Sequence, residues 1–192
     1  MSQRGPYAKG VAKREEILGR ALEIVARQGY RGASVQVIAD AVGLSQAGLL
    51  HYFGSKEELF TAILRKRDEL DHLSRAAPSD PRDARDAFVQ VIAHNSEVPG
   101  LVELFSRLAV EAADPEHPAH AYFLERGEVL RETIVATLAQ LRRPPALPPE
   151  TLARIVQAAA DGLQLQWLLD PTVDMAATME ALLNALAQEG HP

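Results

Sequence analysis

The chain has 192 residues, no cysteine, and 20 basic against 26 acidic side chains, which gives a formal charge of −6. This length suffices to bury a core without disulfides or structural zinc, and the lack of cysteine excludes Cys-ligated zinc, thiolate catalysis and a disulfide framework. The basic N-terminus lacks the apolar segment of a secretory signal, and no stretch approaches the roughly 18 apolar residues of a spanning helix. We therefore expect a soluble cytoplasmic protein.

Charge is divided unevenly along the chain. Residues 1–56 hold eight basic and four acidic side chains and so carry +4, which leaves −10 for residues 57–192. A basic head on an acidic body indicates that only the head approaches a polyanion. A chance fluctuation of surface charge would produce the same numbers, so charge alone does not decide the function.

The first third predicts four helices, each bounded by serine or glycine. Ser34, Ser45 and Ser55 are in N-cap positions, because each precedes an apolar pattern of period 3 to 4. Ser55 also begins a capping box that Glu58 completes, and Gly29 and Gly43 are in stop positions that favour positive φ. The expected helices are 11–28, about 35–42, about 46–52, and one that begins at Ser55.

Proline-containing breaks divide the remaining residues into further helices. The breaks are Asp80-Pro81, Pro99-Gly100, Asp114-Pro115, the four prolines between 144 and 149, and Asp170-Pro171. Apolar residues between them again recur every three or four positions, and no segment alternates as a strand would. The longest predicted helices are about 119–142, about 150–169 and about 174–188. The prediction is an all-α fold of about nine helices.

Residues 34–53, SVQVIADAVGLSQAGLLHYF, have the spacing of a helix-turn-helix. Ala39 is small where two helices cross, Gly43 allows the positive φ of a sharp turn, and Leu49 fills the wedge between the helices. The turn then presents the next helix to a major groove. A short helix pair with a glycine between is weak evidence by itself, but this one lies in the basic head.

Residues 11–71 resemble the DNA-binding domain of the TetR family of bacterial regulators. The resemblance is carried by AKREEILGRALEIVARQGYRGASV, IADAVGLSQAGLLHYF and GSKEELF, and more loosely by PGLVELFSRLAVEAADPEHP and ADGLQLQWLLDP farther on. It implies a homodimeric repressor of a pseudo-palindromic operator, released by a small-molecule effector. The implied domains are a flexible basic arm (1–10), the DNA-binding domain (11–71, motif 34–53), and a helical effector-binding and dimerisation domain (72–192).

The third predicted helix departs from the family pattern. The family often has Gly-Thr-Leu-Tyr where this chain has Ala47-Gly48-Leu49-Leu50, so a phosphate-binding hydroxyl at Gly48 and an aromatic ring at Leu50 are missing. Gly48 either lets the backbone approach DNA closely or is simply tolerated in a short helix, at a cost of roughly 1 kcal/mol relative to alanine. The sequence does not decide between these two interpretations.

The same helix contains no lysine or arginine, so it offers no bidentate arginine for guanine. Gln46 is the best base reader, because its amide pairs with adenine N6 and N7. Ser45 either binds a phosphate or is only an N-cap, and Gln36 either reaches the DNA or lies on a solvated face. The DNA-contact candidates are Arg4, Lys9, Gln36, Ser45, Gln46, Ala47, Gly48, Leu50, His51, Tyr52 and Lys56.

Several of these candidates rest on the resemblance or on position. His51, Tyr52 and Lys56 match family positions that contact phosphates, although Tyr52 is equally suited to packing. Lys56 lies in the first turn of a helix, where the dipole disfavours a cation and a nearby phosphate would offset that cost. Arg4 and Lys9 lie on the predicted arm, which either enters a minor groove or is a solvated tail.

The body holds weaker candidates for an effector pocket. We expect it among the helices of residues 83–142, with one wall from the helix that contains Gln164, although large apolar residues at such spacing are usually core. The candidate liners are Phe88, Ile92, Asn95, Phe105, Leu108, Phe123, Gln164 and Trp167. Asn95, Glu103 and Glu111 would be telling if buried, because a buried polar group needs a partner.

The last two helices are rich in small and apolar residues. By resemblance they form a four-helix dimer bundle with their twins, while ordinary packing within one chain must account for some of them. The dimer candidates are Ala159, Gly162, Leu163, Met175, Met179, Leu182 and Leu186.

Other chemistries find less support. Glu111, Asp114, Glu116, His117 and His120 form an acidic, histidine-containing group that suits either a divalent metal or, more readily, a capped helix junction. No cofactor, resident metal or catalytic motif is expected. A helical enzyme and a helical protein-interaction module without DNA binding are the alternative functions.

Overall fold

The computed structural model describes residues 5–73, 81–139 and 147–188, and every element in these ranges is an α-helix. The helices are α1 (Gly5–Gly32), α2 (Val35–Ala41), α3 (Gln46–Leu50), α4 (Lys56–Leu73), α5 (Pro81–Asn95), α6 (Pro99–Glu111), α7 (His120–Leu138), α8 (Pro149–Leu169) and α9 (Met175–Gln188). The predicted all-α fold is confirmed. None of the helices within these ranges is long and apolar enough to cross a membrane.

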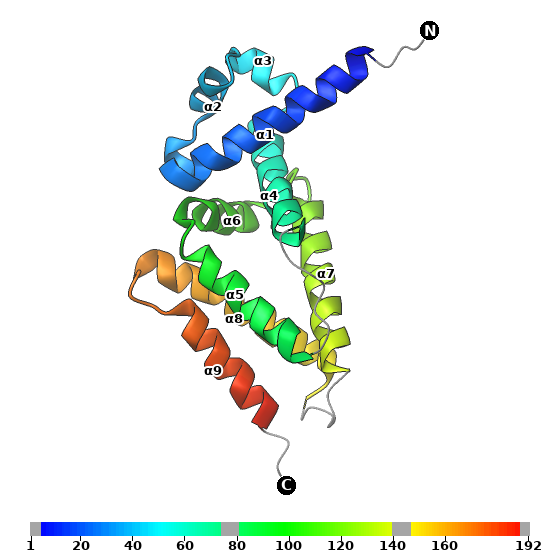
Figure 1. Cartoon of the computed structure of the whole chain (residues 1–192), viewed down its shortest axis with the longest axis vertical. Coiled ribbons are helices and arrows are strands. Elements are labelled where there is room, and N and C mark those ends of the chain that lie inside the picture. Colours follow the sequence, from blue (N-terminus) through cyan, green and yellow to red (C-terminus); the bar gives the residue numbers. More distant parts are fainter. Residues whose placement is uncertain (1–4, 74–80, 140–146, 189–192) are drawn as a thin grey trace.

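Figure 1 shows two parts arranged along the long axis of the molecule. We call α1–α4 the head and α5–α9 the body. The helices α2 and α3 lie beside α1 at the far end of the head, and α4 runs from there toward the body. Helix α9 packs along α5 and α8, and α7 packs along α8.

The first helix begins earlier than predicted. It starts at Gly5, so the prediction of a flexible arm over residues 1–10 is wrong for residues 5–10, and Lys9 lies on α1. Pro6 belongs to the first turn, where the missing N–H of proline leaves no hydrogen bond unmade. Arg4 lies outside the described residues. At the other end, Gly29 interrupts the helical backbone with φ 71° and ψ 174°, as its predicted role as a stop requires.

The serine caps and the glycine turn of the head are where the sequence places them. Ser34, Ser45 and Ser55 accept hydrogen bonds from the backbone N–H three residues later, at 3.2, 3.0 and 3.0 Å. Gly43 has φ 69°, a left-handed value that favours glycine. These local interactions satisfy N–H groups that the helix itself leaves unpaired, and they orient α2 and α3 relative to each other.

Two hydrophobic cores lie inside the described residues. The first contains the inward faces of the head helices together with α6 and the start of α7, for example Leu49, Leu104 and Tyr122. The second joins α5, α8 and α9 around residues such as Ile92 and Met179. Because the first core runs through both parts, the head is packed onto the body rather than connected by a linker.

Helices α1 and α6 approach each other closely at Gly100. A Cβ added there would lie 2.0 Å from the carbonyl oxygen of Val25 and 2.8 Å from the Cα of Gly29. Both atoms belong to backbone, which cannot rotate away as a side chain does. Glycine at position 100 is therefore a requirement of the contact between head and body.

We expect Gly100→Ala to lower the free energy of unfolding by about 3 kcal/mol, because α1 and α6 must separate to admit the methyl group. The matched control is Gly19→Ala in α1, where an added Cβ meets nothing within 4 Å. That variant should gain about 0.5–1 kcal/mol from helix propensity. Urea unfolding at fixed protein concentration measures both, and equal stability of the two variants would contradict the inferred contact.

Candidate nucleic-acid interface

Helix α3 presents one edge to solvent and buries the other. Leu49 is fully buried together with Ile38 and Ala39 of α2, as the wedge interpretation predicted. Gln46 and His51 are exposed at the two ends of the outer edge. This edge lies at the end of the head that points away from the body (Figure 1). An exposed, uncharged edge on a short helix after a sharp turn has the form of a recognition helix.

Two polar candidates next to this edge also have roles within the protein. The Ser45 hydroxyl oxygen accepts the Gly48 N–H at 3.0 Å, so Ser45 is an N-cap. Its O–H hydrogen remains able to donate to a phosphate. The Gln36 amide donates to Asp40 one turn later on the exposed face of α2. That bond favours the interpretation of Gln36 as a solvated surface residue.

Helices α1 and α4 also carry cations, two of which lie against aromatic rings of the head. The Lys56 ammonium lies 5.4 Å from the ring centre of Tyr30 and 5.7 Å from that of Phe60, within the range of cation–π attraction. Lys9 is exposed on α1. Arg14, which the sequence analysis did not single out, lies on α1 with its guanidinium 4.8 Å from the ring centre of Phe53.

The remaining candidates of α3 and its C-terminal end differ in exposure. Ala47 is exposed, whereas Gly48, Leu50 and Tyr52 are half-buried. Tyr52 packs against the first core, which supports its packing role. A Cβ at Gly48 would lie 3.2 Å from the Ser45 Oγ, a tight but not forbidden contact. Steric space therefore does not explain the glycine.

The head is joined to α7 through a partly buried polar network on α4. The Tyr122 hydroxyl donates to Asp68 at 2.7 Å, and the Arg126 guanidinium lies 3.2 Å from the same carboxylate oxygen. Burial raises the pKa of Tyr122, with Asp68 adding to the shift. Arg126 also stacks 4.8 Å from the ring centre of Phe105. Sequence patterns could not reveal this network, because its members on α4 and α7 are more than 50 residues apart.

The predicted effector-pocket residues divide between the two cores. Phe105, Leu108 and Phe123 pack in the first core with the head helices. Phe88, Ile92 and Trp167 belong to the second core with α8 and α9. Their separation supports the interpretation of most of them as core residues.

The buried polar residues of the body have unequal hydrogen bonding. Asn95 is buried and accepts a hydrogen bond from Arg67 of α4. Gln164 is buried, and its Oε1 has no hydrogen-bond partner in the described structure. Burial raises the pKa of Asp161, one turn earlier on α8. By contrast, Glu103 pairs with Arg107 at 2.9 Å and is half-buried, and Glu111 is exposed.

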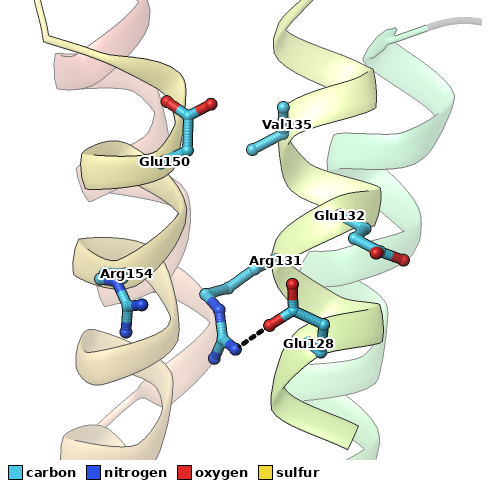
Figure 2. A pocket seen from close by; sticks show the side chains of 6 residues that line it. All are labelled: Glu128, Arg131, Glu132, Val135, Glu150 and Arg154. Atoms are coloured by element: carbon cyan, nitrogen blue, oxygen red, sulfur yellow. Dashed lines mark hydrogen bonds and ion pairs between the residues drawn. The ribbon is translucent and has the colours of Figure 1, made fainter. Parts of the chain in front are cut away.

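None of the predicted liners is among the residues that line the two hollows described on the surface. Figure 2 shows one of about 250 Å³ between α7 and α8. It is lined by Glu128, Arg131, Glu132, Val135, Glu150 and Arg154. Arg131 donates to Gln157 of α8 at 3.0 Å and also pairs with Glu128. A second hollow, of about 280 Å³, lies between head and body.

The dimer candidates need correction. Leu163, Met175 and Met179 are buried in the second core of a single chain and have no surface left for a partner. Ala159, Leu182 and Leu186 are partly buried against the same core. Gly162 has open space where a Cβ would be. Met175 and Met179 of α9 are therefore core residues of one chain, whereas the dimer contact of Ala159, Gly162, Leu182 and Leu186 stays a prediction.

The acidic and histidine-containing segment between α6 and α7 is a capped junction. Asp114 accepts the Glu116 N–H at 3.0 Å, His117 accepts the Ala119 N–H at 3.1 Å, and the His120 ring bonds the Ala112 carbonyl oxygen at 2.8 Å. Within the described ranges, no group of three or more histidine or carboxylate side chains is placed to hold a metal ion. The capping interpretation is confirmed by these bonds.

The turn geometry, the exposed edge of α3 and the basic side chains of the head define a DNA-binding protein of the helix-turn-helix class. Comparison with known proteins agrees. The family model described as bacterial regulatory proteins, tetR family, matches residues 17–63. The HTH-type transcriptional regulator BetI of Agrobacterium fabrum is 30% identical over 164 residues, which cover 80% of this chain and 76% of that protein. The chain belongs to the TetR family of DNA-binding transcriptional regulators, which are not enzymes.

Other relatives match a part of the chain or its fold. The regulator RutR of Escherichia coli K12 is 42% identical over 55 residues, 29% of this chain and 26% of that protein. A transcriptional regulator from Rhodococcus sp. Rha1 is similar in structure with a TM-score of 0.71 and 25% identity, covering 92% of this chain and 96% of that one. A regulator from Saccharomonospora viridis in complex with choline has a TM-score of 0.64 and 23% identity, covering 94% and 97%, which shows a shared fold.

We expect Asp68→Asn to lower the free energy of unfolding by about 1–3 kcal/mol, because it removes the charge that Arg126 pairs with in a partly buried site. Glu125→Gln is the matched control. Glu125 also joins α7 to α4, through Arg65 at 3.0 Å, but both side chains are largely exposed. Glu125→Gln should lower the free energy of unfolding by about 0.5 kcal/mol or less. Urea unfolding of both variants measures the difference, and a larger loss for Glu125→Gln would overturn this ranking.

Proposed function

We propose that this regulator is a repressor that binds a pseudo-palindromic operator as a homodimer and releases it when a small-molecule effector binds the body. The observation that carries the DNA-binding part is the outward edge of α3, with Gln46 and His51 exposed. The protein would act in the cytoplasm, where its operator DNA lies. An enzyme is excluded by the family, and an interaction module without DNA would leave the exposed edge and its cations unexplained.

We assign base reading to Gln46, and binding of the DNA phosphate backbone to Lys56 and Lys9. A glutamine amide discriminates adenine, whereas Lys56 and Lys9 would bind phosphates of any sequence. Lys56 gains from this arrangement, since a phosphate offsets the unfavourable dipole at the start of α4. Two heads related by a two-fold axis would then read half-sites about one helical turn apart.

Dimer formation is assigned to the exposed stripe of α8. Ile155, Ala158, Leu165 and Leu169 are exposed at spacings of three, seven and four residues, on the helix face that also contains Gly162. Leu169 is 87% exposed and Leu165 50% exposed. Such an apolar stripe with small residues at its centre suits close packing against a second copy of the same helix. It replaces the buried methionines as the proposed contact surface.

Effector control is proposed to act through α4. On α4, Asp68 is hydrogen-bonded to α7 and Arg67 to α5. A shift of α5 or α7 would therefore be transmitted to α4, which packs in the same core as α2 and α3. A ligand that favours one position of α4 would lower operator affinity by its differential affinity for the two positions. The Saccharomonospora viridis regulator of the same fold is in complex with the small molecule choline.

We expect Gln46→Ala to relax sequence preference and Lys56→Ala to weaken binding to all sequences alike. Operators are first selected from random duplex DNA, and affinities for single-base variants are then measured by fluorescence anisotropy. Lys56→Ala should also make the slope of log affinity against log salt concentration shallower by about one per chain, which corresponds to the loss of one phosphate contact. Gln90→Ala, which removes an exposed glutamine on α5, is the control. Unchanged base preference in Gln46→Ala would remove Gln46 as a reader.

We expect Leu165→Glu to convert the dimer to monomers, because it introduces a charge in the middle of the proposed contact stripe. Leu124→Glu is the control, since Leu124 is similarly exposed, at 61%, but lies on α7. Sedimentation equilibrium at micromolar concentration distinguishes the two states. A wild-type monomer, or a Leu165→Glu variant that sediments as a dimer, would contradict the proposed surface.

A further inference from the structure

The ammonium group of Lys56 lies over two aromatic rings where α1 meets α4. Its Nζ is 5.4 Å from the ring centre of Tyr30 and 5.7 Å from that of Phe60. The two rings also contact each other, with centres 5.1 Å apart and planes at 55°. Phe60 follows Lys56 by one turn of α4, whereas Tyr30 comes from the end of α1, directly after the kink at Gly29. The electron-rich face of an aromatic ring attracts a cation at such distances.

These rings hold Lys56 without neutralising its charge. Within the described ranges no carboxylate pairs with Lys56, which is exposed at the start of α4. Other lysines of the head are paired, since Lys13 binds Glu16 at 2.7 Å and Lys66 binds Glu15 at 2.7 Å. An ammonium group has three N–H donors. Those that point away from the rings can therefore donate to a DNA phosphate without first displacing a carboxylate.

Tyr30 is itself held by three helices. Its ring packs in the first core beside Phe60 of α4. The Arg107 guanidinium of α6 lies 5.5 Å from the same ring centre and is paired with Glu103 at 2.9 Å. In the part of the chain that the structure describes, Tyr30 makes these contacts with its ring, and its hydroxyl makes no hydrogen bond. The ring is therefore the part of Tyr30 that acts on Lys56.

We propose that Tyr30 is a positioning residue for the phosphate contact of Lys56. Lysine has a flexible four-carbon stem, and immobilising it on a phosphate costs rotamer entropy. A ring that already holds the ammonium group removes part of that cost before DNA binds. This role rests on the proposed function, because it presupposes that Lys56 binds the DNA backbone. It assigns to Tyr30 an effect on DNA affinity that requires no contact between Tyr30 and DNA.

The first test measures the affinity of the full chain for a selected operator by fluorescence anisotropy. The variants are Tyr30→Phe, Tyr30→Leu, Lys56→Ala, and the double variant of the last two. We expect Tyr30→Phe to bind like the unsubstituted chain, because it keeps the ring. Tyr30→Leu should weaken binding to all sequences alike by about two- to fivefold per chain, the range of an exposed cation–π contact. In the Lys56→Ala background, Tyr30→Leu should have no further effect.

The outcomes separate this role from the proposed function. An equal loss from Tyr30→Leu in both backgrounds would show that Tyr30 acts only through packing, and an equal loss for Tyr30→Phe and Tyr30→Leu would show that the ring is not what matters. Either result overturns the positioning role and leaves the phosphate contact of Lys56 intact. If Lys56→Ala changes neither the affinity nor its salt dependence, the phosphate contact fails and the positioning role fails with it.

A second measurement needs no DNA and no destabilising variant. Protons held over an aromatic ring are shielded by its ring current, so the ε-methylene NMR signal of Lys56 should lie upfield of that of Lys9, an exposed lysine on α1. Lysine labelled with carbon-13 makes both signals visible, and Lys56→Arg assigns the first. Tyr30→Leu should move the Lys56 signal toward that of Lys9, and Tyr30→Phe should leave it in place. Coincident Lys56 and Lys9 signals in the unsubstituted chain would overturn the positioning role.

Discussion

The close approach of α1 and α6 at Gly29 and Gly100 is the constraint on which the rest of the structure depends. It brings the two backbones so close that a Cβ at position 100 would collide with the backbone of α1. Because of it, Leu104 and Leu108 of α6 complete the core that also buries Leu49 of the recognition helix. The position of the exposed edge of α3 is therefore determined by packing that extends into the body.

Helix α4 adds polar contacts to this apolar junction. Asp68 binds Tyr122 and Arg126 of α7, and Arg67 binds Asn95 at the end of α5. Hydrogen bonds of this kind are directional, so they specify the rotation of α4 more narrowly than apolar contact does.

Much of the head could be predicted from the sequence, because its signals are local. Serine caps act over three residues, and Gly43 acts through its own backbone angles. The start of α1 was missed although Pro6 is a signal for a first turn. Met175 and Met179 show a different limit, since an apolar stripe reveals that a helix face is buried without revealing which chain covers it.

The sequence by itself determined the helical class, the turn that presents Gln46, and the caps that hold it, since each depends on residues a few positions apart. Only the tertiary structure decided that Arg67 meets Asn95, that Asp68 meets Tyr122, and that apolar walls from α1, α4 and α6 enclose a hollow beside a buried guanidinium. Those partners are 28 to 54 residues apart. Their meeting depends on how whole helices pack, and no short-range pattern records that packing.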